Sequence, residues 1–227
     1  MREAFESGLT GLLVLSAVAT AVTLLHREFG QSREATSSGQ AVKRVRSQAH
    51  RDSARIVLGD PSGKVRVTEF IDFECPFCRR FDSTVRQFVQ QHPGIVTREV
   101  VHFPLTTHRF ALPAARAAEC AGEQDRFETM HRALYDKQDS LGLKSWASFA
   151  REAGIPDTTS FLKCHARSGD FRRIQMGLAA GEREGVTSTP TVIVGDWLFA
   201  VPPTERELAA AINDVLAGRT PNYRRSR

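Results

Sequence analysis

The first 25 residues contain an apolar stretch that has no polar face. Residues 7–25 carry no charged side chain, and their core reads GLLVLSAVATAVTLL. A helix that crosses the hydrocarbon core of a bilayer needs about 20 such residues. The segment 1–25 therefore predicts an N-terminal hydrophobic helix that anchors the chain in a membrane. The alternative is a signal peptide cleaved after the small residues of Ala17-Val18-Ala19.

Residues 26–54 show no apolar periodicity. They include Ser37-Ser38-Gly39-Gln40, a composition typical of flexible segments. We expect residues 26–54 to form a flexible basic linker.

Beyond the linker, the apolar positions follow first the period of strands and then that of a helix. Residues 56–58 and the alternating stretch 64–71 predict strands. Residues 77–89 place an apolar side chain at every third or fourth position, which predicts a helix, and residues 95–103 predict a further strand.

The next part of the chain has a helical pattern over about residues 107–185. Strands then return at 191–194 and 197–201, and Thr204 and Glu207 form the capping-box pattern of a final helix. The order is βαβ, then helices, then ββα. It predicts one α/β sheet domain that is interrupted by an inserted helical subdomain.

Composition limits the classes of function. Apolar residues make up 41% of the 227 residues and charged residues 25%, which is ordinary for a globular protein. The net charge is +5, but residues 26–55 alone hold seven Lys or Arg against three acidic residues. Because the remainder is nearly neutral, we expect no nucleic-acid partner. The basic stretch is interpreted as a solvated linker, with contact to anionic lipids as the alternative.

Two cysteines lie at the predicted junction of a strand and a helix, in the sequence FIDFECPFCRR. Cys75 falls at the N-cap and Pro76 at the first helical position, where its missing N–H costs nothing. The free amides and the dipole of the helix start favour a thiolate at Cys75. Cys78 lies one turn later and is able to close a disulfide onto Cys75. Phe77 is either the first apolar position of the helix or an apolar contact for an unfolded substrate.

The same cysteines do not have the partners of a metal site. Zinc requires two close ligand pairs or nearby histidines, whereas Cys120 and Cys164 are single and lie 44 residues apart. We therefore expect no metal and no cofactor. Arg79 and Arg80 either add positive charge near Cys75 or face solvent.

Three segments together resemble the DsbA-like thiol–disulfide oxidoreductases of the thioredoxin superfamily. They are VTEFIDFECPFCRRFD, VVHFPLTTHRFALPAARAAECA and GVTSTPTVIVGD. The resemblance implies a thioredoxin fold with a helical insertion (about residues 107–185) over a domain of residues 55–218, followed by a basic tail at 219–227.

The resemblance also implies roles for individual residues. Cys75 matches the nucleophilic cysteine and Cys78 the resolving one. Thr189-Pro190 matches the cis-proline loop that packs against the redox pair, where the backbone of Thr189 pairs with an extended substrate. An ordinary trans proline at the start of a strand is the alternative. Ser188 stands where the family often has glycine.

Glu69, six residues before Cys75, matches the buried acid that relays a proton to or from the resolving cysteine. The alternative for Glu69 is a surface residue at a strand edge. The resemblance further implies a structural disulfide between Cys120 and Cys164, with two buried free thiols as the alternative. No histidine stands between Cys75 and Cys78, so the family's source of thiolate stabilisation at that position is missing.

These observations predict an enzyme that exchanges dithiols and disulfides and that most readily acts as an oxidase of exported proteins. Reduced or unfolded exported polypeptides would be its substrates, and a membrane redox partner would re-oxidise it. A reductase or isomerase, a non-enzymatic thioredoxin-like chaperone or binding module, and a metal-delivery protein are the alternatives.

The location of the domain follows from two conflicting signals. The basic residues after the apolar stretch would by charge alone hold the domain in the cytoplasm. An even cysteine count in a redox domain behind an anchor favours export instead. We expect a single-pass N-terminal anchor with an extracytoplasmic domain, or a secreted or periplasmic form after signal cleavage.

Overall fold

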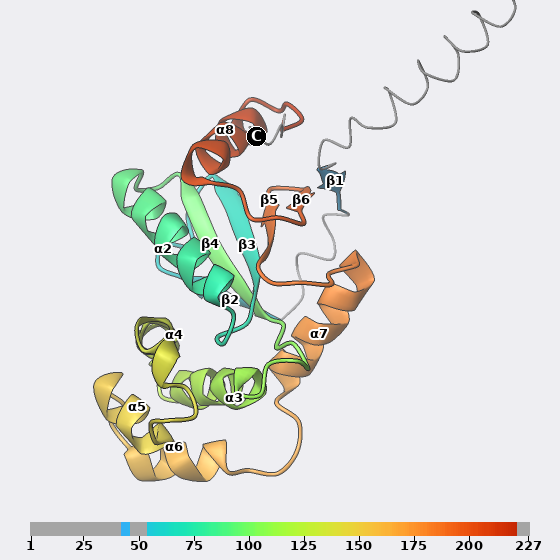
Figure 1. Cartoon of the computed structure of the whole chain (residues 1–227). Helices are drawn as coiled ribbons and strands as arrows, with labels where there is room; N and C mark the ends of the chain where they lie inside the picture. Colours follow the sequence, from blue (N-terminus) through green and yellow to red (C-terminus); the bar gives the residue numbers. More distant parts are fainter. Residues whose placement is uncertain (1–41, 46–53, 222–227) are drawn as a thin grey trace, which may run out of the picture. The chain divides into compact units, whose positions relative to one another are not determined.

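The computed structural model describes residues 42–45 and 54–221, which form a mixed sheet with helices on both faces (Figure 1). The strands are β1 (Lys43–Arg44), β2 (Arg55–Leu58), β3 (Val65–Ile71), β4 (Val96–His102), β5 (Thr191–Val194) and β6 (Trp197–Phe199). The helices are α2 (Pro76–Gln91), α3 (Ala111–Gly122), α4 (Phe127–Asp136), η2 (Gln138–Ser140), α5 (Trp146–Glu152), α6 (Thr158–His165), α7 (Arg172–Glu184) and α8 (Glu205–Leu216).

The sheet has the order β1-β6-β5-β3-β4-β2. Strands β3 and β4 are parallel and are joined by α2, and every other pair is antiparallel. The central position of β3 explains why its sequence VRVTEFI is buried at every residue except Arg66. This mixed α/β thioredoxin-like architecture agrees with the predicted fold class.

The alternation of side chains along the strands divides the core between the two faces of the sheet. One face packs Val65 and Val67 of β3 against α2 and α8. The other face packs Phe70 of β3 and Val101 of β4 against α7. Helix α7 lies so close to β4 that only glycine fits at position 177. A Cβ there would lie 2.3 Å from the carbonyl oxygen of His102.

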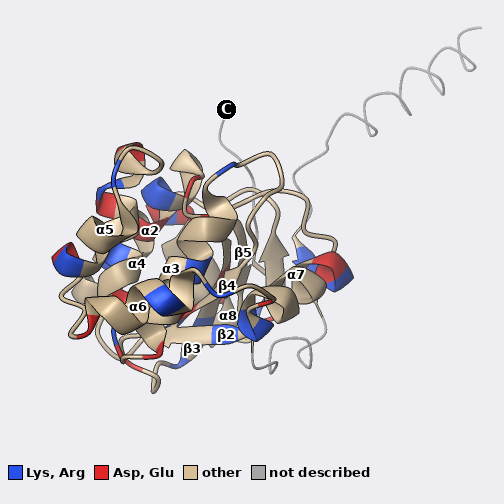
Figure 2. Cartoon of the chain, turned by 90° about the horizontal axis from the view of Figure 1, so that it is seen from below, with Lys and Arg blue, Asp and Glu red and all other residues tan. Residues whose placement is uncertain are grey.

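Helices α3 to α6 form a separate cluster at one end of the sheet (Figure 1). Its core is rich in alanine and aromatic residues and includes Cys75 and Cys78, so the helical cluster packs directly on the start of α2. The predicted insertion of residues 107–185 is therefore divided: α3–α6 make this cluster, whereas α7 covers the sheet. Basic and acidic residues are interspersed along these helices in Figure 2.

The expected flexible linker is wrong for the four residues 42–45. Lys43 and Arg44 form β1 on the edge of β6, and the buried Val45 donates its backbone N–H to the Asp196 carbonyl oxygen (2.8 Å). Two valines flanking two basic residues are too short a pattern to predict a strand, and the free edge of β6 decides the pairing.

Other N- and C-terminal predictions lie outside the described residues. The expected anchor (1–25), most of the linker and residues 222–227 of the basic tail belong to that part. Arg219, the first residue of the tail, donates to Asp214 at 2.8 and 3.0 Å. Within the described ranges, none of the helices combines the length and the apolar character that a membrane span requires.

Candidate active site

The two cysteines of the CPFC motif lie at the start of α2, as the sequence predicts. Cys75 is the N-cap in an extended conformation, and Pro76 occupies the first turn. Within the described residues, no oxygen-bearing side chain caps the first amides of the helix. No acidic residue stands in that first turn. Cys75 is 3% exposed and Cys78 is fully buried.

This geometry gives the thiols of Cys75 and Cys78 different pKa values. A hydrogen bond from Cys78, the adjacent Thr189 and the backbone N–H groups of Cys78 and Phe77 lower the pKa of Cys75 from 9.0 to about 6, against the effect of burial. Burial, followed by the neighbouring Cys75, raises the pKa of Cys78 well above its ordinary value. One sulfur is therefore a stabilised thiolate near neutral pH and the other is a thiol.

The Thr189–Pro190 peptide bond is cis and places the loop before β5 against Cys75. When Cys75 is protonated, its Sγ donates to the Thr189 carbonyl oxygen at 3.2 Å. Thr191 supports the loop by donating its Oγ1 to the Ser188 carbonyl oxygen (2.8 Å). The backbone that the sequence assigned to substrate pairing is thus adjacent to the reactive sulfur.

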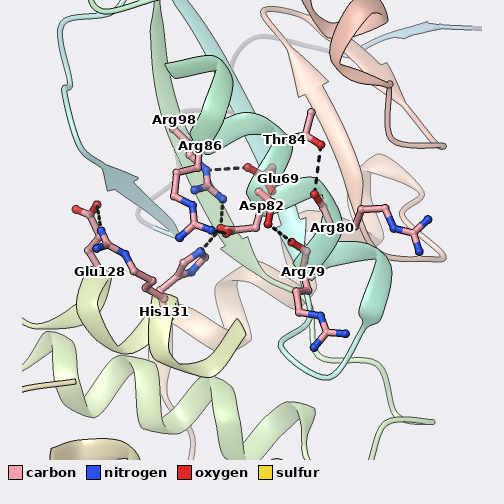
Figure 3. A network of polar contacts seen from close by, with 11 residues as sticks. Glu69, Arg79, Arg80, Asp82, Thr84, Arg86, Arg98, Glu128 and His131 are labelled. Atoms are coloured by element: carbon pink, nitrogen blue, oxygen red, sulfur yellow. Dashed lines mark hydrogen bonds and ion pairs between the residues drawn. The ribbon is translucent and has the colours of Figure 1, made fainter. Parts of the chain in front are cut away.

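Glu69 is fully buried in the central strand, so the alternative of a surface residue is wrong. Arg98 Nε donates to Glu69 Oε1 at 2.9 Å, and Arg98 Nη2 donates to Asp82 Oδ1 at 2.6 Å (Figure 3). Burial raises the pKa of Glu69 in spite of the charge of Arg98. Among the described groups, none hydrogen-bonds the Glu69 Oε2.

His131 of α4 completes this buried network by contacting Asp82 Oδ1 through Nε2 at 2.8 Å (Figure 3). Burial lowers the pKa of His131, which favours a neutral ring that donates its Nε2–H to the Asp82 carboxylate. A cavity of about 150 Å³ reaches Asp82, Arg98 and His131 from the outside. The network therefore extends from the buried Glu69 to a solvent-accessible side.

A second set of contacts holds the turn that leads into Cys75. The buried Asp72 Oδ1 accepts from the backbone N–H of Glu74 (2.8 Å), and its Oδ2 accepts from Leu105 N (2.9 Å) and lies 2.8 Å from His108 Nδ1. Partial burial opposes the charged form of His108, but Asp72, Glu74 and Cys75 together raise its pKa. The contacts with Asp72 thus favour the charged form of His108 beside the motif.

Residues after α4 contact the motif from the helical cluster. Gln138 Nε2 donates to the carbonyl oxygens of Phe73 (2.7 Å) and Cys75 (2.9 Å). Arg79 pairs with Asp139 at 2.9 Å, so its charge is shared with η2. Gln138 fixes the backbone at which Cys75 begins the helix.

Two apolar side chains, one inside the motif and one in the helical cluster, are exposed to solvent. Phe77 is 57% exposed and the Arg80 guanidinium lies 5.7 Å from its ring centre, so Phe77 is not part of the buried helix face. Leu143, in the loop after η2, is 87% exposed. These side chains are available to an apolar substrate segment.

Cys120 of α3 and Cys164 of α6 form a disulfide with a Cα–Cα distance of 5.7 Å. Both are buried in the helical cluster. The bond ties two helices of the insertion together. Among the described residues, no group of three or more His, Cys, Asp or Glu side chains is arranged to hold a metal ion.

Sequence reasoning missed the residues that surround the motif in space. They are Asp72, Asp82, Arg98, His108, His131, Tyr135 and Gln138. One signal was present, because a charged pair Arg98-Glu99 inside the apolar strand VTREVVH indicates buried ion pairs. The others come from α2, α4, η2 and loops, and no motif in the sequence marks them as neighbours of Cys75.

Comparison with known proteins relates this chain to thioredoxin-like proteins. The model of the family described as Thioredoxin matches residues 51–214. "Disulfide bond formation protein D" of Bacillus subtilis is 22% identical over 72% of this chain and 78% of its own length. The Na(+)/H(+) antiporter NhaA 3 of Salinispora tropica is 32% identical over 74% of this chain but only 27% of its own length. This chain thus spans about a quarter of the first curated relatives it matches.

Solved structures show the same architecture. A thioredoxin-like oxidoreductase from Silicibacter pomeroyi is 28% identical, with a TM-score of 0.61 over 75% of this chain and 96% of that one. Oxidised BdbD from Bacillus subtilis is 20% identical, with a TM-score of 0.66 over 78% of this chain and 98% of that one. At 20% identity, the likeness to BdbD shows a shared fold alone.

Proposed function

The chain belongs to the thioredoxin family, and we propose that it oxidises cysteine pairs of exported proteins from a membrane-tethered, extracytoplasmic position. It is a thiol–disulfide oxidoreductase of the DsbA type. The direction of electron flow, the clients and the location form the proposal.

The reaction follows from the two sulfurs. A substrate thiolate attacks Cys75 Sγ in the Cys75–Cys78 disulfide, a new S–S bond forms, and the electron pair of the broken bond leaves on Cys78 Sγ, which takes up a proton. A second substrate thiolate then attacks the substrate sulfur of the mixed disulfide. The substrate leaves oxidised, and Cys75 leaves as a thiolate.

The observation that carries the direction is the low pKa of Cys75 beside the high pKa of Cys78. A stabilised thiolate at Cys75 favours the reduced form of the enzyme, which makes the disulfide form a stronger oxidant. It also makes Cys75 the better leaving group in the last step, so the oxidised substrate is released.

The remaining parts of the proposal come from the sequence and the relatives. The apolar stretch 7–25 supports a membrane anchor, and the Cys120–Cys164 disulfide is typical of oxidising compartments. The name of the Bacillus relative describes disulfide bond formation. A membrane redox partner would accept the electrons of Cys75 and Cys78, and the exposed Phe77 and Leu143 would contact unfolded clients.

The experiment measures the redox equilibrium of the Cys75–Cys78 pair against glutathione, together with oxidative refolding of a reduced test protein. We expect a potential about 100 mV or more above that of cytosolic thioredoxin, near −270 mV. A reduction potential near that of thioredoxin would contradict the oxidase and indicate a reductase. Cys75→Ser should abolish refolding activity, and the matched variant Cys78→Ser should instead trap a mixed disulfide with the client.

A further inference from the structure

The side-chain amide of Gln138 binds the backbone on both sides of Glu74, directly before the redox helix α2. Its Nε2 donates to the carbonyl oxygens of Phe73 at 2.7 Å and of Cys75 at 2.9 Å. Gln138 begins η2, is buried, and lies 65 residues after Phe73 in the sequence. A side-chain amide has two N–H donors, one for each of these acceptors. One nitrogen from the helical cluster therefore holds two peptide units of the motif.

Regular secondary structure does not provide for these two carbonyl groups. Phe73 is buried and precedes α2, so its carbonyl oxygen has no place in the hydrogen-bond ladder of the helix. The Cys75 carbonyl oxygen accepts the first bond of the helix, from the Arg79 N–H, at 3.3 Å. That distance is longer than the usual N–H···O distance of about 2.9–3.0 Å. Glutamine supplies both carbonyl groups with a short hydrogen bond and adds no charge beside the reactive sulfur.

The short helix η2 is itself held beside the start of α2. Leu141, directly after η2, is buried in the same apolar cluster as Cys75 and Cys78. Asp139 of η2 pairs with Arg79 of α2 at 2.9 Å. The amide of Gln138 is therefore in place before the reaction begins.

The backbone conformation of Cys75 decides where its sulfur lies. Cys75 has the extended angles of an N-cap residue, with φ −74° and ψ 119°. Its own N–H donates to the Asp72 carbonyl oxygen at 3.2 Å. In this conformation the backbone N–H groups of Phe77 and Cys78 contribute to the low pKa of Cys75. A rotation of the peptide units next to Cys75 would move the sulfur away from these N–H groups.

We propose that Gln138 is a positioning residue for thiol–disulfide exchange, whose amide fixes the peptide units of Phe73 and Cys75 and so keeps the Cys75 sulfur at the start of α2. Its donors reach carbonyl oxygens rather than sulfur, so Gln138 acts through the backbone of Cys75. The proposal rests on the exchange reaction of the proposed function, but on neither its direction nor its clients.

The test compares Gln138→Met with Gln124→Met in the full chain. Methionine has about the length of glutamine but no N–H donor. Gln124 is the matched control, because its side-chain amide also holds backbone in the helical cluster. Its Nε2 donates to the Asp157 carbonyl oxygen and its Oε1 accepts from the Asp157 N–H, both at 3.0 Å.

Three quantities are measured for each variant. The ultraviolet thiolate absorbance of the reduced chain gives the pKa of Cys75. Glutathione buffers at pH 7 give the equilibrium constant for reduction, in which two glutathione thiols become one glutathione disulfide and the Cys75–Cys78 disulfide becomes two thiols. Guanidinium chloride gives the unfolding midpoint.

We expect Gln138→Met to raise the pKa of Cys75 by about one unit, from about 6. The equilibrium constant for reduction by glutathione at about pH 7 should then fall about fivefold, because a smaller fraction of Cys75 is thiolate. The unfolding midpoint should fall in both variants, since each leaves backbone groups without their side-chain partners. Gln124→Met should keep the pKa and the equilibrium constant of the unchanged chain.

Gln138→Asn keeps the amide group one methylene short of the two carbonyl groups, and it replaces Gln138→Met if that variant does not fold. We expect the pKa of Cys75 to rise in Gln138→Asn as well. A folded Gln138 variant that loses stability but keeps both the pKa and the equilibrium constant would overturn the proposal, because Gln138 would then be structural only.

Failure of the proposed function is distinguished by the unchanged chain. If its reduction potential lies near that of thioredoxin, the proposed oxidase is contradicted. The difference between Gln138→Met and the unchanged chain still tests Gln138 in that case, because a reductase also uses the Cys75 thiolate.

Discussion

The low pKa of Cys75 predicts how its redox equilibrium depends on pH. The perturbation is a change from about pH 5 to about pH 7, across the thiolate pKa of about 6. A thiol whose folded pKa lies below its unfolded value stabilises the reduced fold at high pH, and this contribution is lost as pH falls through the folded pKa. Cys78 stays protonated over this range, because its pKa is raised well above the ordinary value.

The size of the effect follows from the fraction of thiolate. At about pH 7 a thiol with this pKa is about nine-tenths ionised, and at about pH 5 about one-tenth. The equilibrium constant for reduction of the enzyme by glutathione should therefore rise about tenfold, or about 1.4 kcal/mol. A thiol at the ordinary value of 9.0 would leave this constant unchanged over the same range.

The assay equilibrates the full chain with glutathione buffers and quantifies the reduced fraction after alkylation. A titration of the ultraviolet thiolate absorbance of the reduced chain, with the oxidised chain as reference, gives the pKa of Cys75 independently. Ser160→Ala serves as the control variant, since its side chain is exposed on α6. A change below about twofold, with thiolate absorbance appearing only near pH 9, would refute the reasoning.

Four further predictions concern other parts of the chain. His108→Gln should raise the pKa of Cys75 by about one unit in the same absorbance titration, whereas Arg109→Gln, which removes a charge that lies over the Phe110 ring, should not. Because Asp72 raises the pKa of His108, this pair stabilises the fold below about pH 6.5, and the stabilisation is lost as pH rises through the folded pKa. The unfolding curves of His108→Gln and of the unchanged chain should therefore converge at high pH. Replacing both Cys120 and Cys164 by alanine opens a loop of sequence separation 44, whose closure contributes about 4 kcal/mol in the chain-entropy model. The free energy of unfolding in guanidinium should fall by about 2–4 kcal/mol, and a fall under about 1 kcal/mol would contradict this prediction. Thr204→Ala removes the capping box of α8 and should cost about 1 kcal/mol in the same measurement, with no effect on disulfide exchange.

Local patterns in the sequence were sufficient for the elements that frame the site. The apolar pattern of residues 64–71 and the helical spacing after Cys75 predicted β3 and α2, because a strand buried in the sheet and a helix buried on one face each leave a local apolar pattern. The capping box at Thr204 is likewise formed by residues three positions apart. The linker prediction failed at β1, where Lys43 and Arg44 pair with the edge of β6, which is distant in sequence.

The reactive pair itself was determined by the sequence. Cys75 at a helix start and Cys78 one turn later follow from Pro76, from the spacing and from the strand that precedes them, all of which are local. Their acidity was not determined in the same way. It depends on Thr189, in a loop more than 100 residues later, and on the complete burial of Cys78.

Only the tertiary structure decided what surrounds the buried acid. The sequence placed Glu69 six residues before Cys75, but its partner Arg98 comes from β4, and Arg98 also binds Asp82 of α2, which contacts His131 of α4. Electrostatic effects depend on distance and burial rather than on separation along the chain. The sequence therefore determined which atoms react, and the packing of the helical cluster on the sheet decided which of them hold a proton.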